Sequence, residues 1–163
     1  MTNYTLQKQM IQTGAVLCGL AVALGAFGAH ELKDRLNEHD LDTYKTAVNY
    51  QFLHALAILV IGISLRRLYE KSVKQIYYAF LAGIGVFSGS LYLLATRSLT
   101  LGDGLLWIGG ITPIGGVAFL AGWGILAYKG YKRGDSDENR HHRHLHKNKE
   151  SNPEAELSDK TDS

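Results

Sequence analysis

Four long stretches without a charged side chain constrain this chain more than any other feature of its sequence. No Asp, Glu, Lys or Arg occurs within residues 9–30, 46–65, 75–96 or 104–128. A helix needs about 20 mainly apolar residues to cross a hydrocarbon layer of about 30 Å, and each stretch supplies that length. The sequence therefore predicts an all-α integral membrane protein, a bundle of four transmembrane helices. These helices are expected over about residues 10–29, 46–65, 75–95 and 105–128.

The first stretch shares some features with a secretory signal peptide, because Lys8 precedes it and small residues follow it. Its apolar part is longer than the roughly 7–15 residues of such a signal. We therefore expect it to be retained as a membrane helix.

The C-terminal part of the chain has a different composition. Residues 131–163 are rich in charges of both signs and contain almost no large apolar residue, which predicts a disordered tail after a membrane domain over residues 1–130. The tail carries a short run of histidines, and imidazoles can chelate Zn, Ni or Cu. Without cysteines or a preformed geometry, incidental metal binding is the favoured interpretation, and no cofactor is expected. The histidines are His141, His142, His144 and His146.

The distribution of basic residues predicts the orientation in the membrane. Lysine and arginine gather in the loop between the second and third helices, and they recur after the fourth helix and, as Lys8, before the first. Loops rich in these residues stay in the cytoplasm. Both termini are therefore expected to be cytoplasmic, and an even number of spans agrees with this.

Polar residues are expected to converge in one half of the bundle, because antiparallel hairpins bring the end of one helix beside the start of the next. By the charge rule, this is the outer half. Two interpretations remain open. The residues could bond to one another and lock the helices together, or they could line a pocket that binds or passes a small solute or ion. The residues are His30, Tyr44, Tyr50, Gln51, His54, Ser88, Ser90, Tyr92 and Thr112.

Pro113 interrupts the fourth stretch and leaves two possibilities for its helix. Threonine followed by proline is a helix start signal, so the helix could begin at Thr112 and Pro113. Residues 104–111 would then lie at the membrane interface or dip into the protein. Alternatively, one continuous helix is kinked at the proline.

Small residues at helical spacing predict how the helices pack, since membrane helices associate where small side chains let their backbones approach. Gly14, Gly115 and Gly122 are among those expected to pack inside the bundle. Gly85 and Gly89 form a G-x-x-x-G motif, which could serve the bundle or a homo-oligomer. The lipid bilayer is the expected surrounding, and nothing in the sequence indicates nucleic-acid binding.

Function is less constrained than fold. A site for a small solute or ion is the first hypothesis, and a non-catalytic scaffold or accessory protein acting through helix–helix association is the alternative. An enzyme is not expected. No predicted span contains an Asp or Glu that could orient a histidine, and the chain has no P-loop, H-E-x-x-H or G-x-S-x-G motif.

Four sequence motifs carry a resemblance to a known family. "GAFGAH" (residues 25–30), "YKTAVNYQFLHALAIL" (44–59), "FSGSLYLL" (87–94) and "GGITPIGGVAFLAGW" (109–123) resemble the YgdD/YwdK-like family of small bacterial membrane proteins. The resemblance implies four membrane helices in a bacterial inner membrane and no established activity. It also implies that the polar residues named above, with Pro113, match the family pattern. Glu31 departs from that pattern, which usually has glycine there, so a glycine-made turn after His30 is not carried over.

Overall fold

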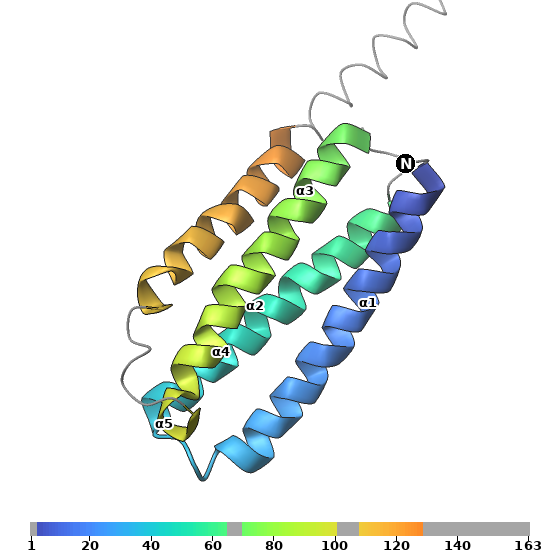
Figure 1. Ribbon diagram of the computed structural model, residues 1–163. Helices are drawn as coiled ribbons and strands as arrows, with labels where there is room; N and C mark the ends of the chain where they lie inside the picture. Colours follow the sequence, from blue (N-terminus) through green and yellow to red (C-terminus); the bar gives the residue numbers. More distant parts are fainter. Residues whose placement is uncertain (1–2, 65–69, 101–107, 129–163) are drawn as a thin grey trace, which may run out of the picture.

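A computed structural model describes residues 3–64, 70–100 and 108–128. The predicted tail, with His141, His142, His144 and His146, lies outside these residues. The described chain is a bundle of helices (Figure 1). Helix α1 (Asn3–Phe27) runs into a π-helical turn, η1 (Gly28–Leu32), and α2 (Glu38–Ile63) returns beside it. A second rod consists of α3 (Glu70–Gly83), the π-helical η3 (Ile84–Ser88) and α4 (Gly89–Ala95), and the short α5 (Arg97–Thr100) follows it. The last helix has a 3₁₀ turn at 108–110 and is α-helical over 112–128.

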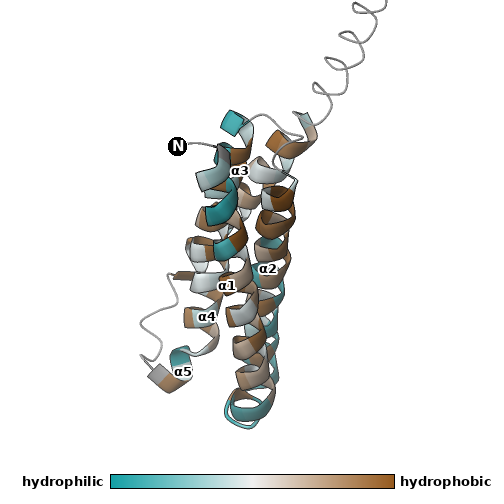
Figure 2. Cartoon of the chain, turned by 90° about the vertical axis from the view of Figure 1, so that its right-hand side faces the viewer, coloured by the Kyte–Doolittle hydropathy of each residue, from teal (hydrophilic) through white to brown (hydrophobic). Residues whose placement is uncertain are grey.

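The predicted fold class is confirmed. Four helices are long and apolar enough to cross a membrane, and each corresponds to one charge-free stretch of the sequence. Their bounds are Tyr4–Leu32, Glu38–Ile63, Glu70–Ala95 and Ile108–Tyr128. Hydrophobic residues predominate along the helices, and the ends of the bundle are mostly hydrophilic (Figure 2), as expected of helices that cross a membrane. Ile114, Val117 and Leu120 on the last helix, for example, are each more than 60% exposed.

Three helices begin earlier in the sequence than the predicted spans, and the first of them, α1, begins at Asn3 instead of near residue 10. Asn37 caps the N-terminus of α2, because its side-chain oxygen accepts a hydrogen bond from the backbone N–H of Asp40 at 2.9 Å. The helix therefore begins at Glu38, whereas the charge-free stretch begins at residue 46. The third helix includes Glu70 and Lys71 ahead of its predicted start near residue 75. Charged residues thus extend α2 and the third helix beyond the apolar core of the membrane.

The helices are arranged so that α1 and the last helix lie on opposite sides, with α2 and the α3–α4 rod between them (Figure 1). We call the end of the bundle that holds η1, the turn before α2 and α5 the hairpin end. The opposite end holds the start of α1 and the start of α3, and we call it the N-terminal end.

The main apolar core lies toward the N-terminal end, and glycines let its helices approach closely. A side chain on Gly14 would collide with Leu59, and one on Gly62 with Met10, which fixes the crossing of α1 and α2. The α3–α4 rod and the last helix meet in the same way: Gly83 faces Phe119, Gly115 faces Phe87 and Gly122 faces Phe80. The core consists of Leu6, Met10, Ala55, Ile58, Ile61, Val73, Ile76, Tyr77, Phe80, Ile84 and Phe119.

Candidate functional site

Gln51 connects three helices near the middle of the bundle. Its side chain is buried, its Nε2 donates a hydrogen bond to the carbonyl oxygen of Leu17 at 3.0 Å, and its Oε1 accepts one from the Tyr92 hydroxyl at 3.0 Å. Leu17 belongs to α1 and Tyr92 to α4. The amide of Gln51 therefore uses both its donor and its acceptor end inside the protein, because a buried polar group without a partner is costly.

Tyr44 extends the same set of contacts toward the hairpin end. Its hydroxyl donates a hydrogen bond to the carbonyl oxygen of Leu24 at 3.1 Å, and its ring meets that of Tyr92 edge-to-face with centroids 5.1 Å apart. A side chain on Gly28 would collide with the Tyr44 ring, so the glycine makes room for it. Both hydroxyls of this tyrosine pair thus donate to groups within the bundle.

His54 is held by a hydrogen bond at each ring nitrogen. Its Nδ1 lies 2.8 Å from the carbonyl oxygen of Tyr50, and its Nε2 lies 3.1 Å from the indole Nε1 of Trp123. An indole N–H can only donate and a carbonyl oxygen can only accept. Nε2 is therefore the acceptor and Nδ1 carries the proton, which assigns the neutral ring and its tautomer.

Aromatic side chains enclose the faces and edges of the His54 ring. The ring stacks on Phe119 with centroids 3.5 Å apart, and it meets the Phe80 ring in an edge-to-face arrangement with centroids 5.3 Å apart. His54 is about 24 Å from the start of α2, past the midpoint of the helix. It therefore borders the main apolar core. The start predicted for this helix, near residue 46, had instead placed His54 in the same half of the bundle as the other polar residues.

Ser90 and Thr112 join α4 to the last helix. Their hydroxyl oxygens are 2.8 Å apart, and Ser90 also donates to the carbonyl oxygen of Phe87 at 2.9 Å. Because Ser90 has a single hydroxyl proton, Thr112 is the donor between them. The last helix becomes α-helical at Thr112, after the 3₁₀ turn, and Pro113 lies in its first turn. The helix thus starts at the Thr–Pro pair, as in the first of the two possibilities.

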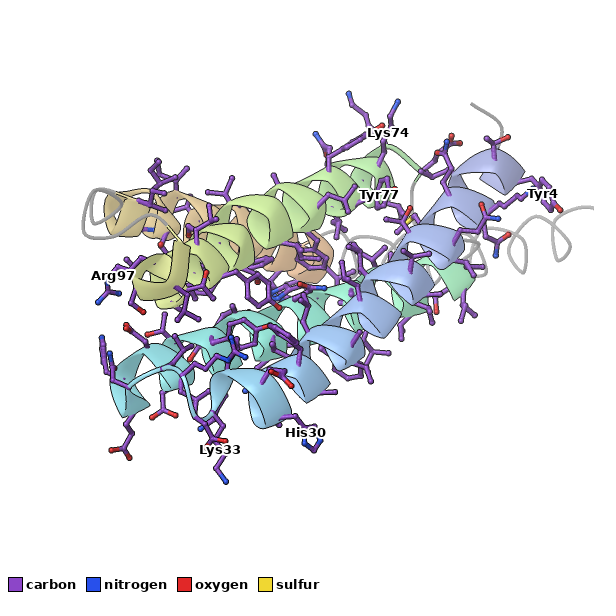
Figure 3. All side chains as sticks on the ribbon, turned by 60° about the horizontal axis from the view of Figure 1, so that its bottom comes forward. Tyr4, His30, Lys33, Lys74, Tyr77 and Arg97 are labelled. Carbon is purple, nitrogen blue, oxygen red and sulfur yellow. The ribbon has the colours of Figure 1, made fainter. Side chains whose placement is uncertain are left out.

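Three of the predicted site residues form no side-chain hydrogen bond with another described residue, although the backbone carbonyl of Tyr50 accepts one from His54. His30 is exposed on η1 and points away from the bundle (Figure 3), and Tyr50 is 42% exposed, with its ring packed on Phe87. Ser88 is fully buried, and its hydroxyl has no hydrogen-bond partner among the described residues. Among the described residues, the structure therefore places six of the nine in contacts between helices, sets Tyr50 beside His54, and leaves His30 and Ser88 outside these contacts.

A buried ion pair at the hairpin end was missing from the sequence interpretation. Asp40 is 1% exposed, and its carboxylate accepts hydrogen bonds from Arg97 at 2.9 Å and from the Asn37 amide at 2.8 Å. Arg97 also donates to the carbonyl oxygen of Leu94 near the end of α4 (Figure 3). The pair ties the start of α2 to the end of α4. One signal could have found it: Arg97 is a lone basic residue directly after a charge-free stretch.

A groove lies along the hairpin formed by α1, η1 and α2. Its volume is about 480 Å³. One wall comes from the end of α1 and from η1, and the other from the first turns of α2. The lining residues are Gly25, Gly28, Ala29, Lys33, Leu41, Tyr44, Lys45, Val48 and Asn49. Of the predicted site residues, only Tyr44 contributes to it.

The helices, their apolar exterior and these contacts define the class: a multi-pass α-helical membrane protein. The model of a family described as "Protein of unknown function (DUF423)" matches residues 24–116, and the chain belongs to that family. UPF0382 membrane protein SAB0533 of Staphylococcus aureus is 38% identical over 77% of this chain and 97% of its own length.

Two further relatives support the same assignment. UPF0382 membrane protein YwdK of Bacillus subtilis is 39% identical over 71% of this chain and 90% of its own length. UPF0382 inner membrane protein YgdD of Escherichia coli is 40% identical over 72% of this chain and 85% of its own length. No solved structure matches the chain. The resemblance seen in the sequence motifs is thereby confirmed.

Proposed function

We propose that this protein is a non-catalytic scaffold or accessory protein of the membrane, which acts by helix–helix association with a second copy of itself. The observation that carries the proposal is the position of Gly85 and Gly89. A Cβ atom placed on either glycine would meet no atom within 4 Å, although Gly83 on the same rod is packed against Phe119. The motif is therefore available for a contact outside the bundle, and small residues at this spacing let two membrane helices approach closely.

The bonding of the polar residues supports an association role over a solute site. Gln51, His54 and Tyr92 use their side-chain hydrogen-bonding groups on one another, on Trp123 and on helix carbonyls. A solute would have to displace these bonds before it could bind. In this proposal, the polar residues lock the helices of one subunit while the surface glycines make the contact with another.

Single-cysteine variants test the association directly, because Cys18 is the only cysteine of the chain. In a Cys18→Ala background, Gly85→Cys and Gly89→Cys are each expected to form disulfide-linked dimers in oxidised membranes. Gly124→Cys is the matched control, since Gly124 is equally open but lies on the last helix. Equal crosslinking at all three positions, or none at 85 and 89, would contradict the proposal.

The orientation proposed from the charge pattern places both termini in the cytoplasm of a bacterial inner membrane. The sequence between the second and third spans carries Arg66, Arg67, Lys71 and Lys74 with Glu70 as its only acidic residue, which supports it. In the Cys18→Ala background, a membrane-impermeant maleimide applied to spheroplasts should label Lys33→Cys at the hairpin end and spare Lys74→Cys. The reverse labelling pattern would overturn the orientation.

A further inference from the structure

We infer that the groove between α1, η1 and α2 binds a membrane phospholipid, with one acyl chain along the groove and the phosphate held by Lys33 and Lys45. This site does not depend on the proposed association, because Gly85 and Gly89 line no part of it. It also uses none of the polar contacts that join the helices, except that Tyr44 forms part of one wall.

Small residues on one wall let α2 approach closely, and the groove follows this line of contact. Gly25, Gly28 and Ala29 lie at helical spacing on that wall, with the Tyr44 ring beside Gly28 and Val48 beside Gly25. The opposite wall is firm, because the Tyr44 hydroxyl is bonded to the carbonyl oxygen of Leu24 and its ring rests on Tyr92. Val48 and Leu41 complete an apolar lining. An apolar channel of this size on the side of a membrane protein suits a hydrocarbon chain, and ligand sites commonly have volumes of about 300–1,000 Å³.

The charges of the groove lie at one end of it. Lys33 belongs to the turn after η1, and Lys45 is the last charged residue of α2 before a charge-free stretch. The lining below them, at Gly25 and Val48, belongs to the part of the hairpin that crosses the hydrocarbon layer. A lipid in this position has its acyl chain at Gly25 and its headgroup at the two lysines. From the membrane surface inward, the lining is thus first charged and then apolar, as a phospholipid is.

The electrostatics favour the phosphate as the group recognised. Lys33 forms no ion pair with any residue that the structure describes, and it points outward at the hairpin end (Figure 3). Lys45 has Asp42 as its partner at 2.8 Å, but both side chains are more than 60% exposed. Exposed pairs of this kind are weak, so Lys45 can turn to a phosphate at little cost. The Asn49 side chain lies about one helical turn below Lys45, next to Val48, and therefore apart from the proposed position of the phosphate.

Native mass spectrometry of the full-length protein in detergent tests the site with defined lipids. Phosphatidylglycerol is expected to bind, and Lys33→Gln and Lys45→Gln should each weaken it about five-fold, since a lysine near an anionic lipid contributes about 1 kcal/mol. The pair Lys71→Gln and Lys74→Gln, at the N-terminal end, is the charge control and should leave binding unchanged. Equal loss in both pairs would overturn the site.

Filling the groove provides a second test. Ala29→Phe should abolish lipid binding, whereas Ala26→Phe, on an equally exposed position of α1 that does not line the groove, should preserve it. If Ala29→Phe lowers the melting temperature, the lysine variants decide, because the side chains of Lys33 and Lys45 are exposed. Unchanged binding in Ala29→Phe at an unchanged melting temperature contradicts the proposal.

Two further ligands separate the parts of the lipid that are recognised. Diacylglycerol with the same chains is expected to bind more weakly than phosphatidylglycerol because it lacks the phosphate. Inorganic phosphate alone is expected to form no stable adduct because it leaves the apolar lining unused. Equal affinity for diacylglycerol, or tight binding of free phosphate, would overturn the assignment.

Discussion

The helices are held together by different kinds of interaction in the two halves of the bundle. Toward the N-terminal end, the helices meet through apolar side chains and glycines, as where Gly122 lies under Phe80. Toward the hairpin end, the apolar cluster is small and consists of Leu32, Leu36, Tyr44 and Ala95. There, hydrogen bonds and the Asp40–Arg97 ion pair make the contacts between helices. In lipid, close packing gives contact area, whereas polar pairs choose the partner and its register. Close packing holds the N-terminal end of the bundle together, and polar pairs hold the hairpin end.

The largest expected effect comes from breaking the ion pair at the hairpin end. Arg97→Ala leaves the carboxylate of Asp40 buried without its cation and should lower the free energy of unfolding by about 3 kcal/mol. Asp40→Ala should cost less, because the Arg97 side chain is 21% exposed and can reach water. Reversible unfolding in mixed micelles, followed by circular dichroism, measures both. An Arg97→Ala protein as stable as the parent would show that the pair contributes nothing.

A substitution in the apolar half should have the next largest effect. A Cβ atom on Gly115 would collide with the backbone of Phe87, so Gly115→Ala should separate the two helices and cost about 1–3 kcal/mol. Gly124→Ala is the control on the same helix, where nothing lies within 4 Å of the added atom. It should be neutral or slightly stabilising, because alanine favours a helix more than glycine does. The same unfolding measurement separates the two variants, and equal costs would count against the close approach.

The smallest effect is expected from removing a single hydrogen bond between helices. Tyr92→Phe removes one hydrogen bond to Gln51, and such bonds between membrane helices average about 0.6 kcal/mol. Gln51→Leu removes the bond to Leu17 as well and should cost roughly twice as much. In the double variant, the costs should not add, because both changes remove the same bond. Full additivity would mean that the two side chains do not interact.

The fold was predictable from the sequence because hydrocarbon imposes a simple rule on it. Charges are excluded from about 20 residues at a time, so the gaps between charges mark the spans directly. The ends of the helices were less predictable. Asn37 caps α2 several residues before the apolar stretch, and that earlier start moves His54 past the middle of its helix.

The candidate site was predictable only as a set of buried polar residues. The sequence identified Gln51, Tyr92 and Thr112 as polar residues within apolar stretches, yet it could not pair them, because pairing depends on the rotation of each helix about its axis. Trp123 escaped notice since an indole in a membrane helix is ordinarily apolar surface. Its N–H fixes the tautomer of His54 only because the last helix turns it toward α2.

The Asp40–Arg97 pair also has a consequence for the order in which the chain is assembled. Helices α1 and α2 can dock as soon as both are made, since Gly14, Gly62 and Tyr44 make their contacts within that first hairpin. Asp40, however, has to wait for a cation that is synthesised 57 residues later. The carboxylate stays in water until then, because an unpaired charge is too costly to bury. The contact that joins α2 to α4 at the hairpin end can therefore form only after the chain has been made as far as Arg97, which sets this part of the bundle apart from the first hairpin.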